Sequence, residues 1–114
     1  MIISAHRAIA HATQLLQNSG VSLSAAERTA RCIVTSDVWG NPSHGLMRLP
    51  FYLQRIAMGG VNSGASLRVL SQRGAVTSMD GEDGLGHWQL WDAAELAVTK
   101  AKEFGISLVS VKNS

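Results

Sequence analysis

The sequence predicts an α+β fold with mixed α/β character, in which N-terminal helices precede a small sheet. Two observations support this fold class. Apolar residues recur three and four positions apart over residues 5–38, which is typical of helices, whereas residues 67–80 contain short runs typical of strands. A long helical pattern and a last strand follow. We therefore expect a helical segment over residues 1–60 and a second segment over residues 61–114.

Two helices are expected at the start of the chain. Ser4 is the expected N-cap of the first helix, and Gly20 is expected to end it. Ser24 and Glu27 have the spacing of a capping box, in which each side chain bonds the other residue's backbone N–H, so the second helix is expected to begin at Ala25. The apolar positions of the two helices are Ala5, Ala8, Ile9, Ala12, Leu15, Leu16, Ala26, Ala30, Ile33, Val34 and Val38.

The second segment reads as a hairpin, a helix and a strand. Residues 67–71 and 75–80 are the expected strands of the hairpin, linked by a turn around residues 72–74. A helix is expected from His87 to about Phe104, with Gly105 as its stop, and residues 106–111 form the last strand. The expected apolar stripe of this helix comprises Trp88, Trp91, Ala94, Val98 and Ala101.

Between the hairpin and that helix lies a glycine-rich stretch, residues 80–86. A phosphate-binding loop would suit its place after a strand and before a helix. Its glycines are ordered G-x-x-G-x-G, however, and not G-x-G-x-x-G, and the carboxylates of Glu82 and Asp83 would repel a pyrophosphate. A close-packed turn is therefore favoured over nucleotide binding.

Residues 40–52 contain the side chains best suited to chemistry. A glycine and a proline break the helical pattern there, so Ser43 and His44 are expected in a tight connection. Arg48 and Tyr52 follow at intervals of four, which in a helix would place His44, Arg48 and Tyr52 on one face. Arginine can hold a carboxylate through two hydrogen bonds, and histidine can exchange a proton near neutral pH. Serine and tyrosine can orient a reacting oxygen, so the group suits a small carbonyl acid.

Two neighbours of this stretch carry further expectations. Asp37 lies near the end of the second helix, where the helix dipole disfavours an acid, so we expect it to have a partner in the loop that follows, either a backbone group or a base. Pro50 lacks the N–H that a continuous helix would need, so a kink or a new helix beginning at Pro50 is expected.

A structural interpretation of the same residues stays open. Ser43 could be a helix N-cap, His44 a solvated residue of the first turn, and Arg48 and Tyr52 a surface pair with the arginine stem on the ring.

The pattern of Asp37, Gly40, Ser43-His44-Gly45, Arg48-Leu49-Pro50, Tyr52, Arg55 and Gly59 resembles the N-terminal signature of the malate/L-lactate dehydrogenase family of the non-Rossmann type. That family also contains ureidoglycolate dehydrogenase, diketogulonate reductase and the reductases of cyclic imino acids. Its members are much longer than 114 residues, so the resemblance implies the N-terminal part of such an enzyme, with residues 61–114 opening the cofactor-binding domain.

The resemblance also implies a function. It implies an oxidoreductase that uses NAD or NADP to interconvert a 2-hydroxy acid and a 2-keto acid, or to reduce a cyclic imino acid. Ser43 and His44 would form a catalytic proton-relay pair, and Arg48 and Tyr52 would line the substrate pocket. Most cofactor contacts would come from later sequence, so the fragment alone is expected to be inactive. The alternative is a non-catalytic fragment or interaction module derived from such an enzyme.

Composition excludes several other classes. The net charge of +2 is too small for a nucleic-acid footprint, and no apolar run is long enough to span a membrane. Cys32 is the one cysteine, so no internal disulfide forms and a buried, inert thiol in a cytoplasmic protein is expected. His6 and His11 lie five apart, which does not suit a metal-chelating pair, and no metal is expected. The sparse core favours association, and we expect a homodimer.

Overall fold

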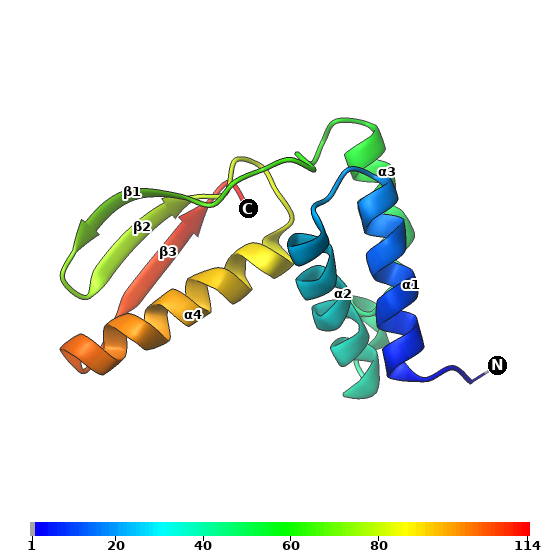
Figure 1. The fold of residues 1–114 in the computed structure, drawn as a ribbon, viewed down its shortest axis with the longest axis horizontal. Helices are drawn as coiled ribbons and strands as arrows, with labels where there is room; N and C mark the ends of the chain where they lie inside the picture. Colours follow the sequence, from blue (N-terminus) through cyan, green and yellow to red (C-terminus); the bar gives the residue numbers. More distant parts are fainter. Residues whose placement is uncertain (1) are drawn as a thin grey trace. The chain divides into compact units, whose positions relative to one another are not determined.

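The computed structural model describes residues 2–114, which form two compact units, residues 2–64 and 65–114. The first unit is helical and the second contains a three-stranded sheet (Figure 1). This confirms the α+β fold class predicted from the sequence. Each unit is described below in turn.

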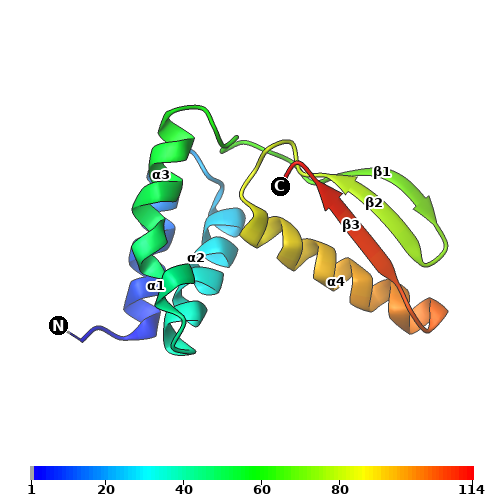
Figure 2. The same cartoon turned by 180° about the vertical axis from the view of Figure 1, so that it is seen from behind.

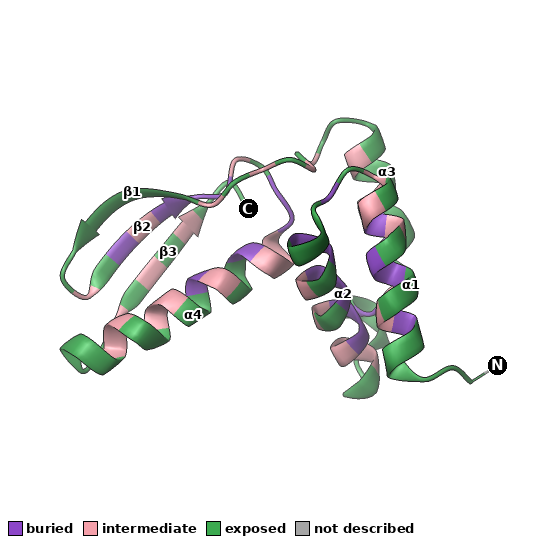
Figure 3. Cartoon of the chain, viewed as in Figure 1, coloured by how far each residue is buried: buried purple, intermediate pink, exposed green. Residues whose placement is uncertain are grey.

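The first unit is built on a helical hairpin. Helix α1 (Ala5–Asn18) and helix α2 (Leu23–Val38) pack side by side along a seam of small and branched apolar residues (Figures 1 and 2). Alanines along this seam allow the two helices to approach closely. Figure 3 colours the ribbon purple at buried residues, and the buried apolar residues of the two helices are Ala8, Ala12, Leu16, Ala25, Ala26, Ala30, Ile33 and Val34. Val38, expected on this face, is instead exposed.

The N-cap of α1 was predicted correctly, whereas the N-cap of α2 was not. Ser4 caps α1 as predicted, because its Oγ accepts a hydrogen bond from the N–H of Arg7. The expected capping box of α2 was wrong. Ser22, two residues before Ser24, is the N-cap and accepts from the N–H of Ala25, so the helix begins at Leu23. Once Ser22 holds that N–H, Ser24 lies inside the first turn.

Three short elements complete the first unit. Two 3-10 turns, η1 (Pro42–His44) and η2 (Leu46–Arg48), lead into helix α3 (Leu49–Ala57). A new helix therefore begins beside Pro50, as expected, although its first residue is Leu49. Pro50 lies in the first turn of α3, where its missing N–H costs no helical hydrogen bond.

The second unit places one helix on one face of a sheet. Strands β1 (Arg68–Arg73) and β2 (Val76–Asp80) form the predicted antiparallel hairpin, and β2 pairs in parallel with β3 (Leu108–Lys112). Helix α4 (Gly86–Phe104) connects β2 to β3 and covers the face that carries Thr77 and Met79 (Figure 1). Gly105, at φ 85°, ends α4 as predicted, because glycine readily adopts the left-handed backbone conformation found there.

The buried face of α4 differs from the predicted stripe. The fully packed residues of this helix are Gln89 and Ala93, whereas Trp91, Ala94 and Val98 are exposed (Figure 3). The Gln89 amide donates a 2.6 Å hydrogen bond to the carbonyl of Gly81, just beyond β2, so this side of the helix faces the sheet. Three of the five residues of the predicted stripe are therefore exposed, while Trp88 and Ala101 are half-buried.

Candidate active site

The turn that carries Ser43 and His44 is fastened to the end of α2. The Asp37 carboxylate accepts a 2.8 Å hydrogen bond from the N–H of Leu46, which confirms the expected partner in the following loop as a backbone group. Gly45 lies against the same carboxylate so closely that a Cβ there would overlap Asp37 Oδ1. A glycine at position 45 therefore allows the loop to close over Asp37, and this closure sets where η1 and η2 begin.

Ser43 and His44 contact each other within η1. Ser43 Oγ lies 3.0 Å from His44 Nδ1 and donates a hydrogen bond, also 3.0 Å long, to the side-chain oxygen of Asn41. All three side chains are exposed in this chain. The imidazole is thus oriented through Nδ1 and exposed. Such a group can accept a proton from a bound molecule or donate one to it.

The arginine expected to bind substrate lies on the next element. Arg48 ends η2 and its guanidinium lies 5.9 Å from the centre of the Phe51 ring, with Arg55 at 5.8 Å from the same ring. The exposed Arg48 can offer its planar pair of donors to a carboxylate. The ring that faces the Arg48 guanidinium here is that of Phe51, the residue before Tyr52.

Tyr52 lies on α3 and is half-buried, with its ring 6.0 Å from that of Phe51. The expectation that His44, Arg48 and Tyr52 share one helical face was wrong, because each lies on a different element: η1, η2 and α3. Spacing of four gives one face only where an α-helix is continuous. The structure thus joins Ser43 to His44, whereas Arg48 and Tyr52 follow on separate elements.

Asn41 is the residue of this site that the sequence reasoning missed. Its place at the start of η1 is the usual place of a capping asparagine, yet its side chain makes no cap hydrogen bond and binds Ser43 instead. The signal in the sequence was an asparagine two residues before a serine, a spacing at which asparagine often bonds nearby groups.

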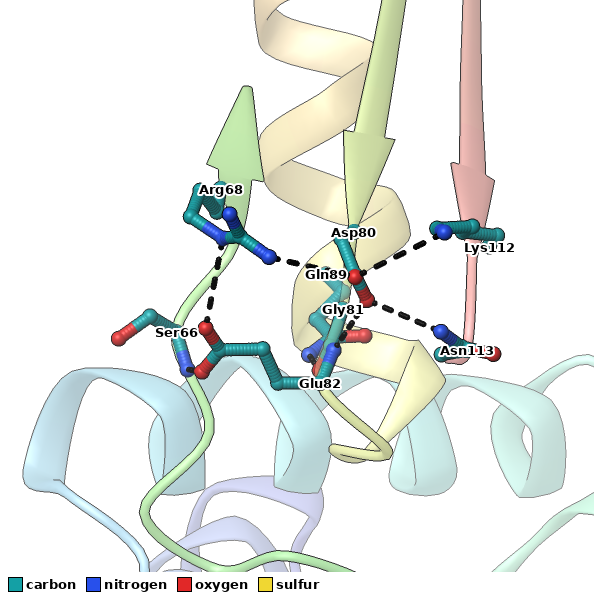
Figure 4. Close-up of polar contacts among 8 residues, drawn as sticks. All are labelled: Ser66, Arg68, Asp80, Gly81, Glu82, Gln89, Lys112 and Asn113. Atoms are coloured by element: carbon teal, nitrogen blue, oxygen red, sulfur yellow. Dashed lines mark hydrogen bonds and ion pairs between the residues drawn. The ribbon is translucent and has the colours of Figure 1, made fainter. Parts of the chain in front are cut away.

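A second polar cluster lies in the other unit, at the ends of β2 and β3 (Figure 4). Asp80 is its centre, with hydrogen bonds from the N–H of Glu82 (2.9 Å) and the side-chain amide of Asn113 (3.2 Å). These bonds, helped by the charges of Lys112 and Arg68, hold the pKa of Asp80 below its usual range. Because its partners are supplied from within the unit, this cluster fixes the strand ends.

The glycine-rich loop that begins in this cluster is filled by the protein itself. A Cβ on Gly81 would overlap the Gln89 side chain and approach the carbonyl of Asn113, and a Cβ on Gly84 would overlap the Gln89 amide. The glycines therefore make room for Gln89, which confirms the predicted close-packed turn. Glu82 and Asp83 adopt left-handed backbone conformations in the same loop.

Two further titratable groups have shifted pKa values. Burial raises the pKa of the Cys32 thiol, which favours its protonated form, and the residue is half-buried where a buried thiol was expected. Burial lowers the pKa of His87, which favours its neutral form. Within residues 2–114, the structure contains no group of three or more His, Cys, Asp or Glu that could hold a metal ion. No helix in this range is long and apolar enough to cross a membrane.

Residues 3–114 match the family model described as malate/L-lactate dehydrogenase. The malate dehydrogenase of Pyrococcus horikoshii is 36% identical over 101 residues, covering 89% of this chain and 28% of the relative. Its solved structure superposes on the whole chain with a TM-score of 0.95 and 32% identity, over 33% of that structure. This similarity confirms that the fold is a fragment of the fold of that enzyme.

Two further relatives differ in their named substrates. The (2R)-3-sulfolactate dehydrogenase (NADP(+)) of Chromohalobacter salexigens is 35% identical over 113 residues, which are 99% of this chain and 34% of the relative. The Delta(1)-pyrroline-2-carboxylate/Delta(1)-piperideine-2-carboxylate reductase of Pseudomonas putida is 30% identical over 100 residues, 88% of this chain and 29% of the relative. The chain thus spans about a third of the length of these proteins.

Proposed function

Because this chain belongs to the malate/L-lactate dehydrogenase family, we propose that it forms the N-terminal part of an oxidoreductase that interconverts a 2-hydroxy acid and a 2-keto acid. Reduction of a cyclic imino acid is the related reaction of the same class. The observation that carries the proposal is the 3.0 Å contact between Ser43 and His44, which orients an exposed imidazole beside a loop built around Asp37.

In this proposal each site residue has a separate task. His44 accepts the proton of the substrate hydroxyl during oxidation and returns it to the carbonyl oxygen during reduction. Ser43 holds the imidazole through Nδ1. Arg48 binds the substrate carboxylate with two donors, while Phe51 supports its guanidinium. Tyr52 lines the substrate pocket from the start of α3.

The cofactor of the proposed reaction is NAD or NADP, which supplies hydride transfer when bound. The glycine-rich loop does not fit a pyrophosphate, since Gln89 fills the space beside Gly81 and Gly84 and two carboxylates lie in the loop. We therefore propose that, in a full-length enzyme, the cofactor binds to the part that corresponds to the region of the relatives not matched by this chain. The 114-residue chain, assayed alone with NADH or NADPH against 2-keto acids, is expected to show no turnover.

The test uses the full-length enzyme carrying these residues. His44→Ala is expected to lower kcat by roughly 10²–10⁴-fold, the range for a positioned acid or base, with a smaller change in KM. Arg48→Ala is expected to raise KM, and Arg48→Lys to recover only part of the loss, because lysine keeps the charge without the paired donors. Near-normal turnover by a folded His44→Ala enzyme would contradict the catalytic assignment of His44, whereas absence of turnover in the unmodified full-length protein would favour a non-catalytic module.

We further propose that the protein is a cytoplasmic homodimer. The outward residues Trp91, Ala94 and Val98 of α4 line an apolar surface that a partner subunit or further chain could cover. Light scattering of the purified protein tests this, with a dimer as the expected result. A monomer at all concentrations that also fails to bind a hydrophobic dye would contradict the proposal.

A further inference from the structure

The contacts around Ser43 restrict where its hydrogen can lie. A serine hydroxyl has one hydrogen to donate and lone pairs with which to accept. In the structure the hydroxyl donates to the side-chain oxygen of Asn41, at 3.0 Å. The contact between Ser43 Oγ and His44 Nδ1, also 3.0 Å, must then be a hydrogen bond in which Nδ1–H donates and Oγ accepts.

This assignment determines the tautomer of the neutral imidazole. With the hydrogen on Nδ1, the lone pair of the ring lies on Nε2, which is the nitrogen free to accept a proton. We propose that Asn41 is a positioning residue that holds neutral His44 in the Nδ1–H tautomer and so presents Nε2 as the proton acceptor for the substrate hydroxyl. The role in catalysis rests on the proposed function, whereas the tautomer itself can be measured without it.

The backbone holds Asn41 in place for this task. Its N–H donates to the carbonyl of Ser36 at the end of α2, and its carbonyl accepts from the N–H of His44 at 3.2 Å. The following residue is Pro42, whose ring disfavours the helical conformation for residue 41, and Asn41 has φ −117° and ψ 68°. Asn41 is therefore anchored to both α2 and η1, and its side chain is directed to Ser43 instead of capping η1.

The opposite arrangement gives an opposite tautomer. If the Asn41 amide were rotated, its NH₂ group would donate to Ser43, the hydroxyl would donate to Nδ1, and the ring hydrogen would lie on Nε2. Nε2 would then be unable to accept a proton from the substrate. The two arrangements differ only in hydrogen positions, so an experiment that reports protonation of each ring nitrogen separates them.

The experiment is long-range ¹H–¹⁵N NMR of the 114-residue chain with ¹⁵N-labelled histidine, at about pH 8.5, where an unperturbed imidazole is neutral. The signals of His44 are assigned by their loss in His44→Gln. His6 and His11 are exposed and report the tautomer ratio of a solvated imidazole in the same sample. We expect His44 to be shifted strongly toward Nδ1–H relative to both. A ratio equal to theirs, or shifted toward Nε2–H, would overturn the proposal.

Variants show whether Asn41 is the cause. Asn41→Ala removes the acceptor and is expected to move His44 toward the Nε2–H form, because Ser43 can then donate to Nδ1. Asn41→Asp keeps an acceptor and is expected to retain the Nδ1–H form. Asn18→Ala is the matched control, since Asn18 is another exposed asparagine whose side-chain oxygen accepts a hydrogen bond, here from Gln14. An unchanged His44 tautomer in folded Asn41→Ala would count against the role of Asn41.

Kinetics of the full-length enzyme complete the test. Asn41→Ala is expected to lower kcat about tenfold with little change in KM, a size typical of residues that orient a functional histidine. Asn41→Asp is expected to restore most of the loss. If the tautomer shifts in Asn41→Ala but kcat stays normal in both Asn41→Ala and His44→Ala, the proposed function fails, and the positioning role in catalysis fails with it. If His44→Ala is inactive but Asn41→Ala has normal kcat, only the positioning role fails.

Discussion

The Asp37 carboxylate accepts a hydrogen bond from the N–H of Leu46 across Gly45, which has no side chain to obstruct the contact. The bond joins the last turn of α2 to the first residue of η2. A carboxylate that accepts a backbone hydrogen bond needs close approach of the main chain, and any Cβ at residue 45 would lie within the carboxylate itself. The position of the Ser43–His44 turn therefore depends on this pair.

Gly45→Ala is expected to destabilise the protein by about 1–3 kcal/mol, the usual cost of overpacking a close contact. Urea unfolding gives the measurement. Gly64→Ala is the control, because a Cβ there meets only Asn62 Oδ1, at 3.8 Å. Combining Gly45→Ala with Asp37→Ala should cost less than the sum of the single changes, since the overlapping carboxylate is gone. Strictly additive losses of stability in that cycle would show that a Cβ at residue 45 does not clash with the Asp37 carboxylate.

The pH dependence of stability is expected to include a contribution from Asp80. Its folded-state pKa is lowered, chiefly by the N–H of Glu82 and the Asn113 amide, relative to an unfolded value of about 3.9. A depressed acid pKa gives stabilisation that is complete above the unfolded pKa and is lost as the pH falls through the folded pKa. Unfolding midpoints between about pH 7 and pH 2 should therefore decline less steeply at the acid end in Asp80→Asn than in the native chain.

A buried charge at residue 89 is expected to be poorly tolerated. Gln89 is fully buried, and its amide donates to the carbonyl of Gly81. Gln89→Glu replaces that donor with a carboxylate facing a carbonyl oxygen, so we expect a loss of several kcal/mol at neutral pH. Part of the loss is recovered when the acid is protonated, which burial moves to a pH above the usual range of glutamate. Gln14→Glu is the control, because Gln14 is exposed and bonds Asn18. Equal effects of the two changes on the urea midpoint would refute the packing role of Gln89.

The elements that the sequence predicted well are those set by local chemistry. The Ser4 cap, the helix start beside Pro50 and the Gly105 stop each depend on neighbours a few residues away. The α2 start was misplaced because Ser22 and Ser24 are both plausible caps, and only the backbone geometry selects Ser22. Local sequence cannot separate two capping residues two positions apart.

The buried side of α4 could not be predicted from hydrophobic periodicity, because its most buried residue is Gln89, a polar side chain. Burial there is possible since the glycines of the preceding loop leave room for the amide and Gly81 accepts its hydrogen bond. At the candidate site, the family signature led to Ser43 and His44. The motif did not predict the two successive 3-10 turns, of which the first ends at His44 and the second at Arg48.

The parallel pairing of β2 with β3 has a consequence for the order in which the second unit folds. β1 and β2 are joined by a tight turn, so their hairpin closes a short loop, whereas pairing Val76 with Leu108 closes a longer loop that contains α4, and we expect it to form later. Asp80 can thus pair with Arg68 early, when the hairpin forms, but gains Asn113 and Lys112 only when β3 docks. We therefore expect the contacts of this one carboxylate to form at different stages of folding.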